Sequence, residues 1–243
     1  MRTINAIFKR EFFGYFRSPV AYVFLIVFLI ASVGLTLFVG QFFAANDASL
    51  NRFFIFMPWV FLFLIPAVGM RLWAEEKRSG TWELLLTLPV TTIEAVLGKF
   101  LAGWTFITLA ILLTLTMPIT VGYLGNPDWG PILSGYLGTI LMAGAFLSIC
   151  SLTSALTKNQ VISFVLSVII CLILVFLGWS VFNNLLTSIN IPVWLIDALS
   201  NFSFITHFDP MTKGLITIAD LIFYLSLIIF SLLLNVLALE RSF

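Results

Sequence analysis

The sequence has very little charge. Only 9% of its 243 residues are Asp, Glu, Lys or Arg, whereas 61% are apolar, and the mean hydropathy is +1.13. A soluble globule of this size leaves about a quarter or more of its surface in water, so it could not hide this much apolar surface. The shortage of charge therefore excludes a soluble domain and predicts an all-α integral membrane protein, because helices satisfy their own backbone hydrogen bonds in lipid.

The sequence also lacks the residues that most enzyme sites need. It has one histidine, His207, and two cysteines, Cys150 and Cys171, both of which lie inside apolar runs. Covalent or metal-assisted chemistry needs a nucleophile with a base, or a cluster of ligands. We therefore predict a non-catalytic chain with a structural histidine and two buried cysteines, and we expect it to bind no cofactor, metal ion or nucleic acid.

A P-loop is missing as well. This phosphate-binding motif reads G-x-x-x-x-G-K-[ST]. The only Gly-Lys pair, Gly98-Lys99, is followed by Phe100, and no glycine lies five residues before Gly98. If ATP drives this protein, a separate subunit has to hydrolyse it.

What the sequence does contain is six long apolar runs. A bilayer core of about 30 Å requires roughly 20 residues of helix, and the six runs approach this length. Pro58, Pro66 and Pro118 lie inside two of them and predict kinks. We expect one membrane domain over residues 1–243, with spans at 20–43, 53–70, 100–124, 132–156, 161–182 and 221–239.

Residues 3–17 form an amphipathic segment ahead of the first span. Phe12 and Phe16 belong to an apolar face at helical spacing. The basic residues of the segment fall largely on other faces: Lys9, Arg10 and Arg17. A basic amphipathic helix with aromatic residues on its apolar side lies in a membrane interface rather than across the membrane.

The stretch 183–217 contains apolar pieces that are too short to cross a bilayer. We expect short interfacial or re-entrant helices of the outer leaflet there. Asp220, at the start of the last predicted span, is expected to reach the lipid headgroups, and Asn235, inside that span, to bond to another helix.

Basic residues set the expected orientation. Of the twelve Lys and Arg residues, all but Arg52 and Lys213 fall on the side of the predicted spans that carries both chain ends. Short cytoplasmic loops are rich in Lys and Arg. We therefore expect a multi-pass plasma-membrane protein with both termini in the cytoplasm.

The charged residues gather in one window, 74–99, between the second and third spans. Its pattern predicts a helix that ends at Gly80, a short helix that starts at Thr81, and a third helix capped by Thr91 with Glu94. The short middle helix could rest on lipid, or it could dock in a groove of a soluble partner. The candidate docking residues are Glu75, Glu76, Lys77, Arg78, Gly80, Thr81, Trp82, Glu83, Leu85, Pro89 and Glu94.

The 74–99 window, together with its surroundings, resembles a loop of a known protein family. The basic elbow helix, the six spans and the loop pattern E-E-x-x-x-G-T-x-E-x-L-L-x-x-P-V-x-x-x-E-x-x-x-G-K are similar to those of ABC type-2 transporter permeases. KREFFGYFRSPVAYVF, PWVFLFLIPAVGMRLWAEE and LGNPDWGPILSGYLG resemble the subgroup associated with gliding motility and copper-enzyme maturation most closely. The likeness covers about residues 3–182.

The resemblance implies a set of partners and an activity. In that family the loop is a coupling helix that seats in an ATPase subunit. The likeness therefore implies two ATPase copies that hold ATP and Mg²⁺, and a second permease subunit in a homodimer or, with a sister permease, a pseudo-dimer, of which we favour the homodimer. It also implies substrate export through the subunit interface in a bacterial inner membrane. An auxiliary membrane or extracytoplasmic protein is a further partner that the family allows.

Two alternatives stay open. An ATPase-coupled mechanical or signalling subunit that moves no substrate would carry the same loop. A secondary transporter or channel fits less well, because such proteins place ionisable residues inside the membrane and the predicted span interiors lack Lys, Arg, Glu and His.

Overall fold

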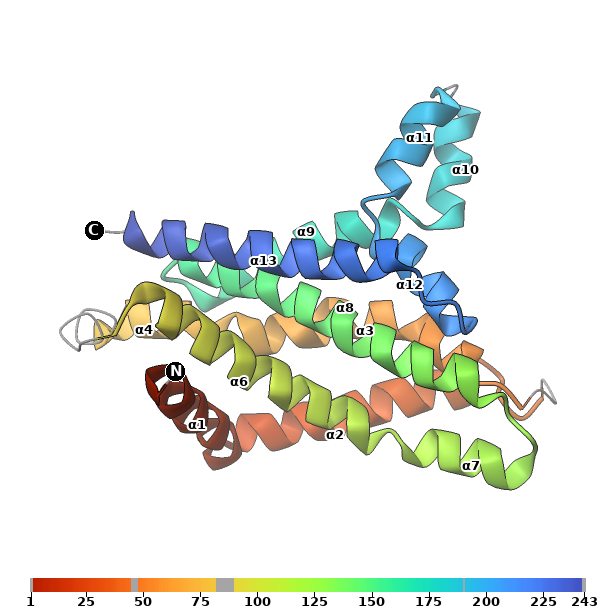
Figure 1. Cartoon of the computed structure of the whole chain (residues 1–243), viewed down its shortest axis with the longest axis horizontal. Coiled ribbons are helices and arrows are strands. Elements are labelled where there is room, and N and C mark those ends of the chain that lie inside the picture. Colours follow the sequence, from red (N-terminus) through yellow and green to blue (C-terminus); the bar gives the residue numbers. More distant parts are fainter. Residues whose placement is uncertain (1, 45–47, 82–89, 190, 242–243) are drawn as a thin grey trace.

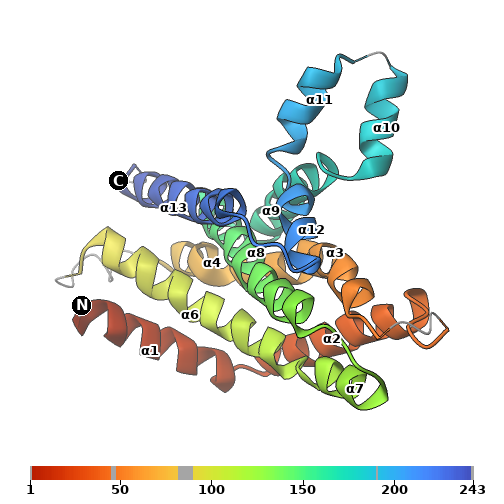
Figure 2. The ribbon, with the colours of Figure 1, turned by 45° about the vertical axis from the view of Figure 1, so that its right-hand side comes forward.

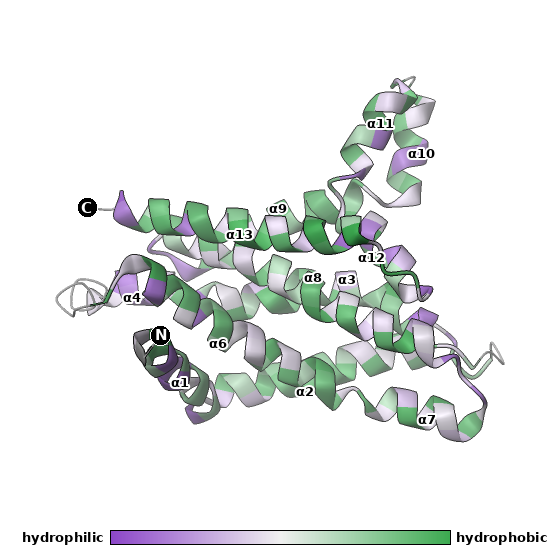
Figure 3. Cartoon of the chain, in the orientation of Figure 1, coloured by the Kyte–Doolittle hydropathy of each residue, from purple (hydrophilic) through white to green (hydrophobic). Residues whose placement is uncertain are grey.

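The computed structural model describes residues 2–44, 48–81, 90–189 and 191–241. Over these ranges every regular element is a helix and none is a strand. Five helical segments are long and apolar enough to cross a membrane, and there are six candidates if a pair of helices bent by 72° is counted as one span. The predicted all-α, multi-span architecture is thus confirmed, and Figure 3 shows apolar residues along the middle of the bundle with polar residues towards its ends.

The chain begins with two helices joined at a proline. Ser18 caps the second helix by accepting a hydrogen bond from the Val20 amide, and Pro19 occupies its first turn, where a missing N–H group costs nothing. A π-helical turn extends this helix, so that the first span ends at Val39, before the predicted residue 43. The elements are α1 (Arg2–Arg17), α2 (Pro19–Gly34) and η1 (Leu35–Val39).

The second and third spans are each interrupted. Met70 separates α3 from α4, and its amide still donates to the Pro66 carbonyl at 2.9 Å, so the proline ring does not itself cause this break. The third span breaks just before Pro118, whereas Pro58 lies inside an unbroken helix. The elements are α3 (Asn51–Gly69), α4 (Arg71–Ser79), α6 (Thr92–Leu113) and α7 (Thr116–Leu124).

The fourth span, α8 (Trp129–Leu156), is the central helix of the bundle. It packs against α3, α6, α9, α12 and α13. Small residues permit these close approaches: a Cβ atom on Gly144 would lie 2.9 Å from the Trp104 ring, and one on Gly69 of α3 would lie 2.3 Å from Cys150 Cβ. Cys150 and Cys171 are both buried and free, as predicted.

The fifth span is shorter than predicted. α9 (Gln160–Phe176) ends six residues before the expected residue 182, and α10 (Ser180–Ser188) continues at an angle of 72°. The bend occurs at Gly178, where a Cβ atom would lie 2.4 Å from Ser203 Oγ. Ser203 also donates a hydrogen bond to the Val175 carbonyl at the end of α9, so a contact from the following loop sets the break.

The predicted short helices before the last span are present. α10 and α11 (Val193–Ser200) form a pair that projects from the bundle in both views, whereas α12 (Phe204–Thr212) packs on α8 (Figures 1 and 2). α13 (Ile218–Glu240) then crosses back alongside α8.

The bundle has two distinct ends in Figure 1. We call the end where α4 and α13 finish and α6 begins the loop end. The end where α7 finishes and α8 begins is the far end. α1 lies at the loop end against the first part of α6 in both views.

Candidate functional site

The first stem of the charged window is α4, which continues the second span. Its end is set by Gly80, whose φ of 72° lies in the left-handed region that glycine adopts without strain. The Ser79 hydroxyl donates to the Glu76 carbonyl and bonds to the Thr81 hydroxyl at 2.9 Å, which occupies polar groups at the helix end. Glu75 and Arg78 are exposed on this stem. The predicted helix end at Gly80 is confirmed.

The second stem is the start of α6, and its cap was also predicted correctly. The Thr91 hydroxyl accepts from the Glu94 amide at 3.3 Å, and the Glu94 carboxylate accepts from the Thr91 amide at 3.2 Å. This reciprocal pair fixes where the helix begins. The segment between the two stems, with Trp82, Glu83, Leu85 and Pro89, lies outside the described residues.

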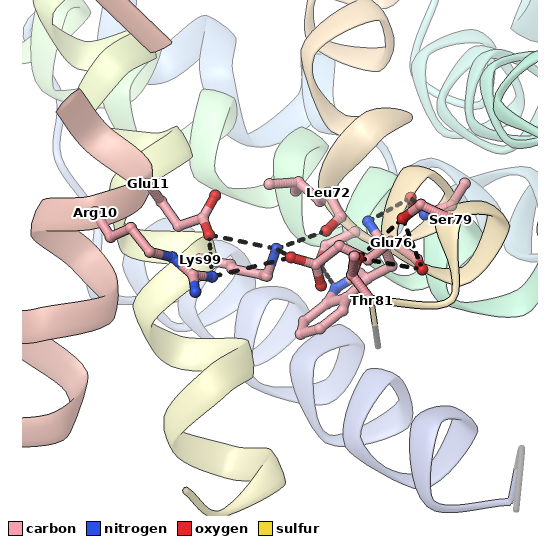
Figure 4. A network of polar contacts seen from close by, with 11 residues as sticks. Arg10, Glu11, Leu72, Glu76, Ser79, Thr81 and Lys99 are labelled. Carbon is pink, nitrogen blue, oxygen red and sulfur yellow. Dashed lines mark hydrogen bonds and ion pairs between the residues drawn. The ribbon is translucent and has the colours of Figure 1, made fainter. Parts of the chain in front are cut away.

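A buried lysine joins the two stems. Lys99 of α6 has only 3% of its side chain exposed, and its ammonium group donates to Glu76 Oε1 at 2.7 Å and to the Leu72 carbonyl at 3.1 Å. The same group lies 5.0 Å from the centre of the Trp73 ring. Figure 4 shows the ammonium group between these oxygens. A charge removed from water needs such compensation, because its desolvation costs several kcal/mol.

The same lysine reaches the N-terminal helix. Glu11 Oε1 of α1 lies 3.6 Å from the Lys99 ammonium and 2.7 Å from the Arg10 guanidinium, which in turn lies 3.9 Å from Glu76. Burial alone would raise the pKa of Glu11, but the neighbouring Lys99 and Arg10 charges outweigh it and hold the pKa below its ordinary value. We call Arg10, Glu11, Glu76 and Lys99 the Lys99 network.

Apolar packing supports this polar connection between α1 and α6. A Cβ atom on Gly98 would lie 2.8 Å from Ile7 Cγ2, so only glycine permits this approach. The Tyr15 ring stacks on Phe106, with ring centres 4.8 Å apart. Of the residues predicted for the elbow helix, the aromatic ones are half-buried and the basic ones are exposed: Phe12 and Phe16, and Lys9, Arg10 and Arg17.

α4 is also fixed to the central helix α8. Ser154 Oγ accepts from the amides of Trp73 and Ala74, each at 3.0 Å, and donates to the Met70 carbonyl at 2.9 Å. One hydroxyl thus occupies three backbone groups at the break between α3 and α4. The Lys77 ammonium donates to the Ala155 carbonyl at 2.5 Å.

Ser151 extends this contact to the last span. Its hydroxyl accepts from the indole N–H of Trp73 at 3.1 Å and from the Asn235 amide at 2.6 Å. The predicted interhelical bond of Asn235 is therefore confirmed. α4, α8 and α13 consequently meet at one polar contact inside the bundle.

A second buried polar contact lies at the far end. His207 Nδ1 is 2.8 Å from Asp220 Oδ1, and His207 Nε2 is 2.9 Å from the Asn201 carbonyl. Asp220 is only 4% exposed, so the expectation that it reaches the headgroups is wrong. Its carboxylate instead caps α13 with Thr217 and pairs with His207, and this pairing compensates for its burial.

Sequence reasoning missed the two central residues of the Lys99 network. In the sequence Lys99 is one of several charges in the 74–99 window, and no local pattern assigns a role to Glu11. The Gly98-Lys99 pair at the end of the loop pattern was the available signal for this network. Ile7 packs closely against Gly98, and the carboxylates of Glu11 and Glu76 lie beside the Lys99 ammonium group. Among the described residues, no three His, Cys, Asp or Glu side chains gather as a metal site.

The fold and this end define an all-helical, multi-span membrane subunit whose charged loop rests on two joined stems. Residues 53–241 match the family described as ABC-2 family transporter protein. The chain belongs to this family and is an ABC transporter permease. ABC-2 permeases pair with ABC ATPase subunits. A search of curated proteins gave no significant match.

Proposed function

We propose that this chain is the permease subunit of an ATP-driven ABC exporter, and that the loop at 74–99 couples it to a separate ATPase subunit. One observation carries the proposal: the buried Lys99 ties both stems of the loop to each other and to α1. A loop that only rested on lipid would have no need of a buried charge at its base.

The connections make the loop a lever on the rest of the bundle. A force that a bound ATPase subunit applies to the loop would move α4 and α6 together, because the Glu76–Lys99 pair joins these two helices. The Ser154 and Lys77 contacts carry the displacement to α8, and Glu11 carries it to α1. Closure of ATPase subunits can thereby tilt the second, third and fourth spans as one body.

The charge distribution favours a cytoplasmic loop end. α4, the start of α6 and the end of α13 carry basic residues, whereas the far end has Arg52 at the start of α3 and Lys213 after α12. Lys and Arg concentrate on the cytoplasmic side of membrane proteins. An ATPase in the cytoplasm would then meet the loop directly.

Family membership and this orientation support a proposed assembly. Two ATPase subunits would hold ATP and Mg²⁺, two copies of the permease would form a homodimer in a bacterial inner membrane, and substrate would pass along the subunit interface. Export is the direction shared with the permeases that the sequence resembles, and their gliding-motility and copper-enzyme-maturation subgroup is the proposed place of this chain within the family.

The test is co-purification of the tagged chain in mild detergent, with measurement of ATP hydrolysis in the eluate. We expect an ATPase subunit to be retained, and Glu83→Lys or Trp82→Ala to abolish its retention or its coupling. Glu240→Lys, a charge reversal at the end of α13, serves as the matched control. If native chain and both variants retain no ATPase, or if Glu83→Lys is fully coupled, the proposal is wrong.

A further inference from the structure

The ring of His207 is held between two hydrogen-bond acceptors at the base of the projecting α10–α11 pair. Its Nε2 lies 2.9 Å from the carbonyl of Asn201, which follows α11, and its Nδ1 lies 2.8 Å from Asp220 Oδ1 at the start of α13. A ring turned by 180° would place carbon atoms at both contacts, so the two hydrogen bonds select this orientation. The imidazole therefore bridges the end of the projecting pair and the last span.

The partners of the ring determine how many protons it carries. A backbone carbonyl can only accept, so Nε2 carries a hydrogen atom. At Nδ1, the shared proton belongs either to the ring or to Asp220. Asp220 Oδ2 accepts from the Thr217 hydroxyl at 2.6 Å, and Asp220 stands in the first turn of α13, where the helix dipole favours a negative charge. Both observations favour an ionised Asp220, and the ring is then a doubly protonated imidazolium.

The surroundings suit a charged ring at this position. The ring stacks on Phe223, with ring centres 4.1 Å apart, and a cation over an aromatic face is stabilised. Only 14% of the His207 side chain and 6% of the Asp220 side chain are exposed, so water does not readily replace a lost partner. A buried ion pair is stable only when its hydrogen bonds are complete, and here that requires both ring protons.

Asp220 is the one acidic side chain that contacts the ring within the described ranges. α12 packs against α3, α8, α9 and α13. Asp209 pairs with Lys213 on the exposed side of α12, and Arg52 at the start of α3 donates to a backbone carbonyl. The other titratable side chains on these helices, at their caps and on α11 are buried tyrosines and cysteines, exposed aspartates and a glutamate at the loop end: Tyr136, Tyr224, Cys150, Cys171, Asp128, Asp197 and Glu240.

The Asn201 end of this contact bears on the projecting pair. α10 and α11 pack on each other and not extensively on any other described helix, and both views show them standing away from the bundle (Figures 1 and 2). The chain returns to the bundle over residues 201–203. There His207 holds the Asn201 carbonyl, and Ser203 donates to the Val175 carbonyl. The ring is therefore one of the ties that fix the base of the pair.

We propose that His207 is a proton-dependent latch for the α10–α11 pair. While the ring holds both protons, it donates to Asp220 and to the Asn201 carbonyl and fixes the base of the pair. A rise in pH removes one proton to solvent, and the remaining N–H group stays on the carboxylate, which is the stronger acceptor. The Nε2 lone pair then faces the Asn201 carbonyl oxygen, and the base of the pair is released. Because the fixed state binds more protons, low pH favours it and high pH releases it.

The latch depends on this chain alone and does not require the ATPase partner. With the loop end in the cytoplasm, as proposed above, His207 lies towards the opposite side of the membrane, and the latch responds to the pH there. Its response can be measured on protein in detergent, so failure of the latch and failure of the proposed function are distinguishable.

The first test is nitrogen-15 NMR of the full-length protein in detergent, with labelled histidine and an affinity tag that contains no histidine. His207 is the only histidine of the chain, so every signal reports on it. At about pH 7.5, where most histidine in water has lost its second proton, we expect both ring nitrogens to carry hydrogen. Asp220→Asn should lose the second proton at a lower pH than the native chain. A native ring with one bare nitrogen at that pH, or equal titration of the two proteins, would overturn the proposal.

A pair of spin labels measures the release of the projecting pair. The labels are at Asn184→Cys in α10 and Leu133→Cys in α8, which are both exposed, while the native cysteines are buried. We expect a narrow distribution of distances at about pH 6 that broadens as the pH rises through the range in which histidine titrates. The midpoint should coincide with the loss of the second proton of His207. A distribution that ignores pH, or that changes at a different pH, would contradict the latch.

His207→Gln removes the latch, because glutamine has no ring that donates to both acceptors at once. We expect a broad distribution of distances over the whole pH range. Asp209→Asn is the matched control, since Asp209 lies on the same helix in an exposed ion pair, and it should keep the pH response. A melting curve at low pH checks that both variants fold, and the titration of the native chain stands without them. A narrow distribution in His207→Gln at low pH, or a lost response in Asp209→Asn, would contradict the assignment.

Discussion

The two ends of this bundle each bury a contact between titratable side chains, but the two contacts join different kinds of neighbours. At the far end, His207 and Asp220 lie 13 positions apart and join α12 to the start of α13, with the Asn201 carbonyl as a third partner. At the loop end, Lys99 joins α6 to Leu72 and Glu76 of the α4 stem and to Glu11 of α1. The far-end pair shapes one corner, whereas the Lys99 network connects elements that are distant in sequence.

The two contacts also differ in the groups that surround them. His207 contacts Asp220 while its ring stacks on Phe223, so the imidazole ring packs between α12 and α13. Lys99 is held by two carboxylates, one carbonyl and one aromatic face, and the network borders an open cavity. The far-end contact therefore joins two neighbouring helices, whereas the Lys99 network connects both stems of the 74–99 loop to α1.

Breaking the Lys99 network should have the largest effect. Lys99→Met removes the cation closest to Glu76 and leaves Glu11 with Arg10 alone. The loss of one partner of a buried pair costs about 3–5 kcal/mol. We expect a clearly lower melting temperature in detergent. Adding Glu76→Gln to Lys99→Met should recover part of the loss, because the buried carboxylate is then neutral. If the effects of Lys99→Met and Glu76→Gln on stability simply add in the double variant, Lys99 and Glu76 are not coupled.

Breaking the far-end pair should cost less. Asp220→Asn keeps the shape of the side chain and loses its charge, so we expect a destabilisation of about 1–3 kcal/mol and no change in ATPase coupling. The exposed Asp209–Lys213 pair provides the control: Asp209→Asn should change stability by less than about 1 kcal/mol. If Asp220→Asn abolished the coupling of ATP hydrolysis to the permease, the far-end contact would not be purely local, and the proposed difference between the two ends would be wrong.

The close approach of α1 to α6 can be tested without touching a charge. Gly98→Ala places a Cβ atom 2.8 Å from Ile7 Cγ2, and such overpacking costs about 1–3 kcal/mol. Gly14→Ala is the matched control, because a Cβ atom there meets nothing within 4 Å, and removal of a helical glycine should stabilise α1 by about 0.5–1 kcal/mol. Melting curves of the two variants should therefore shift in opposite directions.

The smallest effect concerns pH. The folded-state pKa of Glu11 lies below its ordinary value of 4.5, so its contribution to stability is present above that value and is lost as the pH falls through the lowered folded-state pKa. We expect the melting temperature of the native chain to fall as the pH drops below about 4.5, and the Glu11→Gln variant to fall less steeply over the same interval. Parallel curves would mean that Glu11 is not held by Lys99 and Arg10.

Local signals made part of this structure predictable. The Thr91–Glu94 cap, the helix end at Gly80 and the restart at Ser18-Pro19 each depend on residues within one turn of each other. These features follow from backbone hydrogen bonding and from the conformational freedom of glycine. They could therefore be placed before the fold was known.

The remaining features depend on contacts between distant segments. The end of α9 at Phe176 is set by Ser203 approaching Gly178, and the apolar run itself continues past that point. A lysine beside an apolar run ordinarily extends to the membrane surface, and only Glu76 and Glu11 explain why Lys99 is buried instead. Pairing of this kind cannot be read from spacing along one chain.

The central claim is that the Lys99 network makes α1 and the loop stems move as one body. The most direct test is a pair of spin labels at Asn5→Cys in α1 and Ser79→Cys in α4, both exposed, in the permease–ATPase complex with and without ATP. The native cysteines are buried and should stay unlabelled. With Lys99 present, we predict a narrow distribution of distances between the two labels that ATP leaves unchanged. With Lys99→Met, we predict a distribution that broadens or shifts when ATP is added. The account would be contradicted if ATP changed the distance between the labels while Lys99 is present. It would also be contradicted if that distance were the same with Lys99→Met as without it.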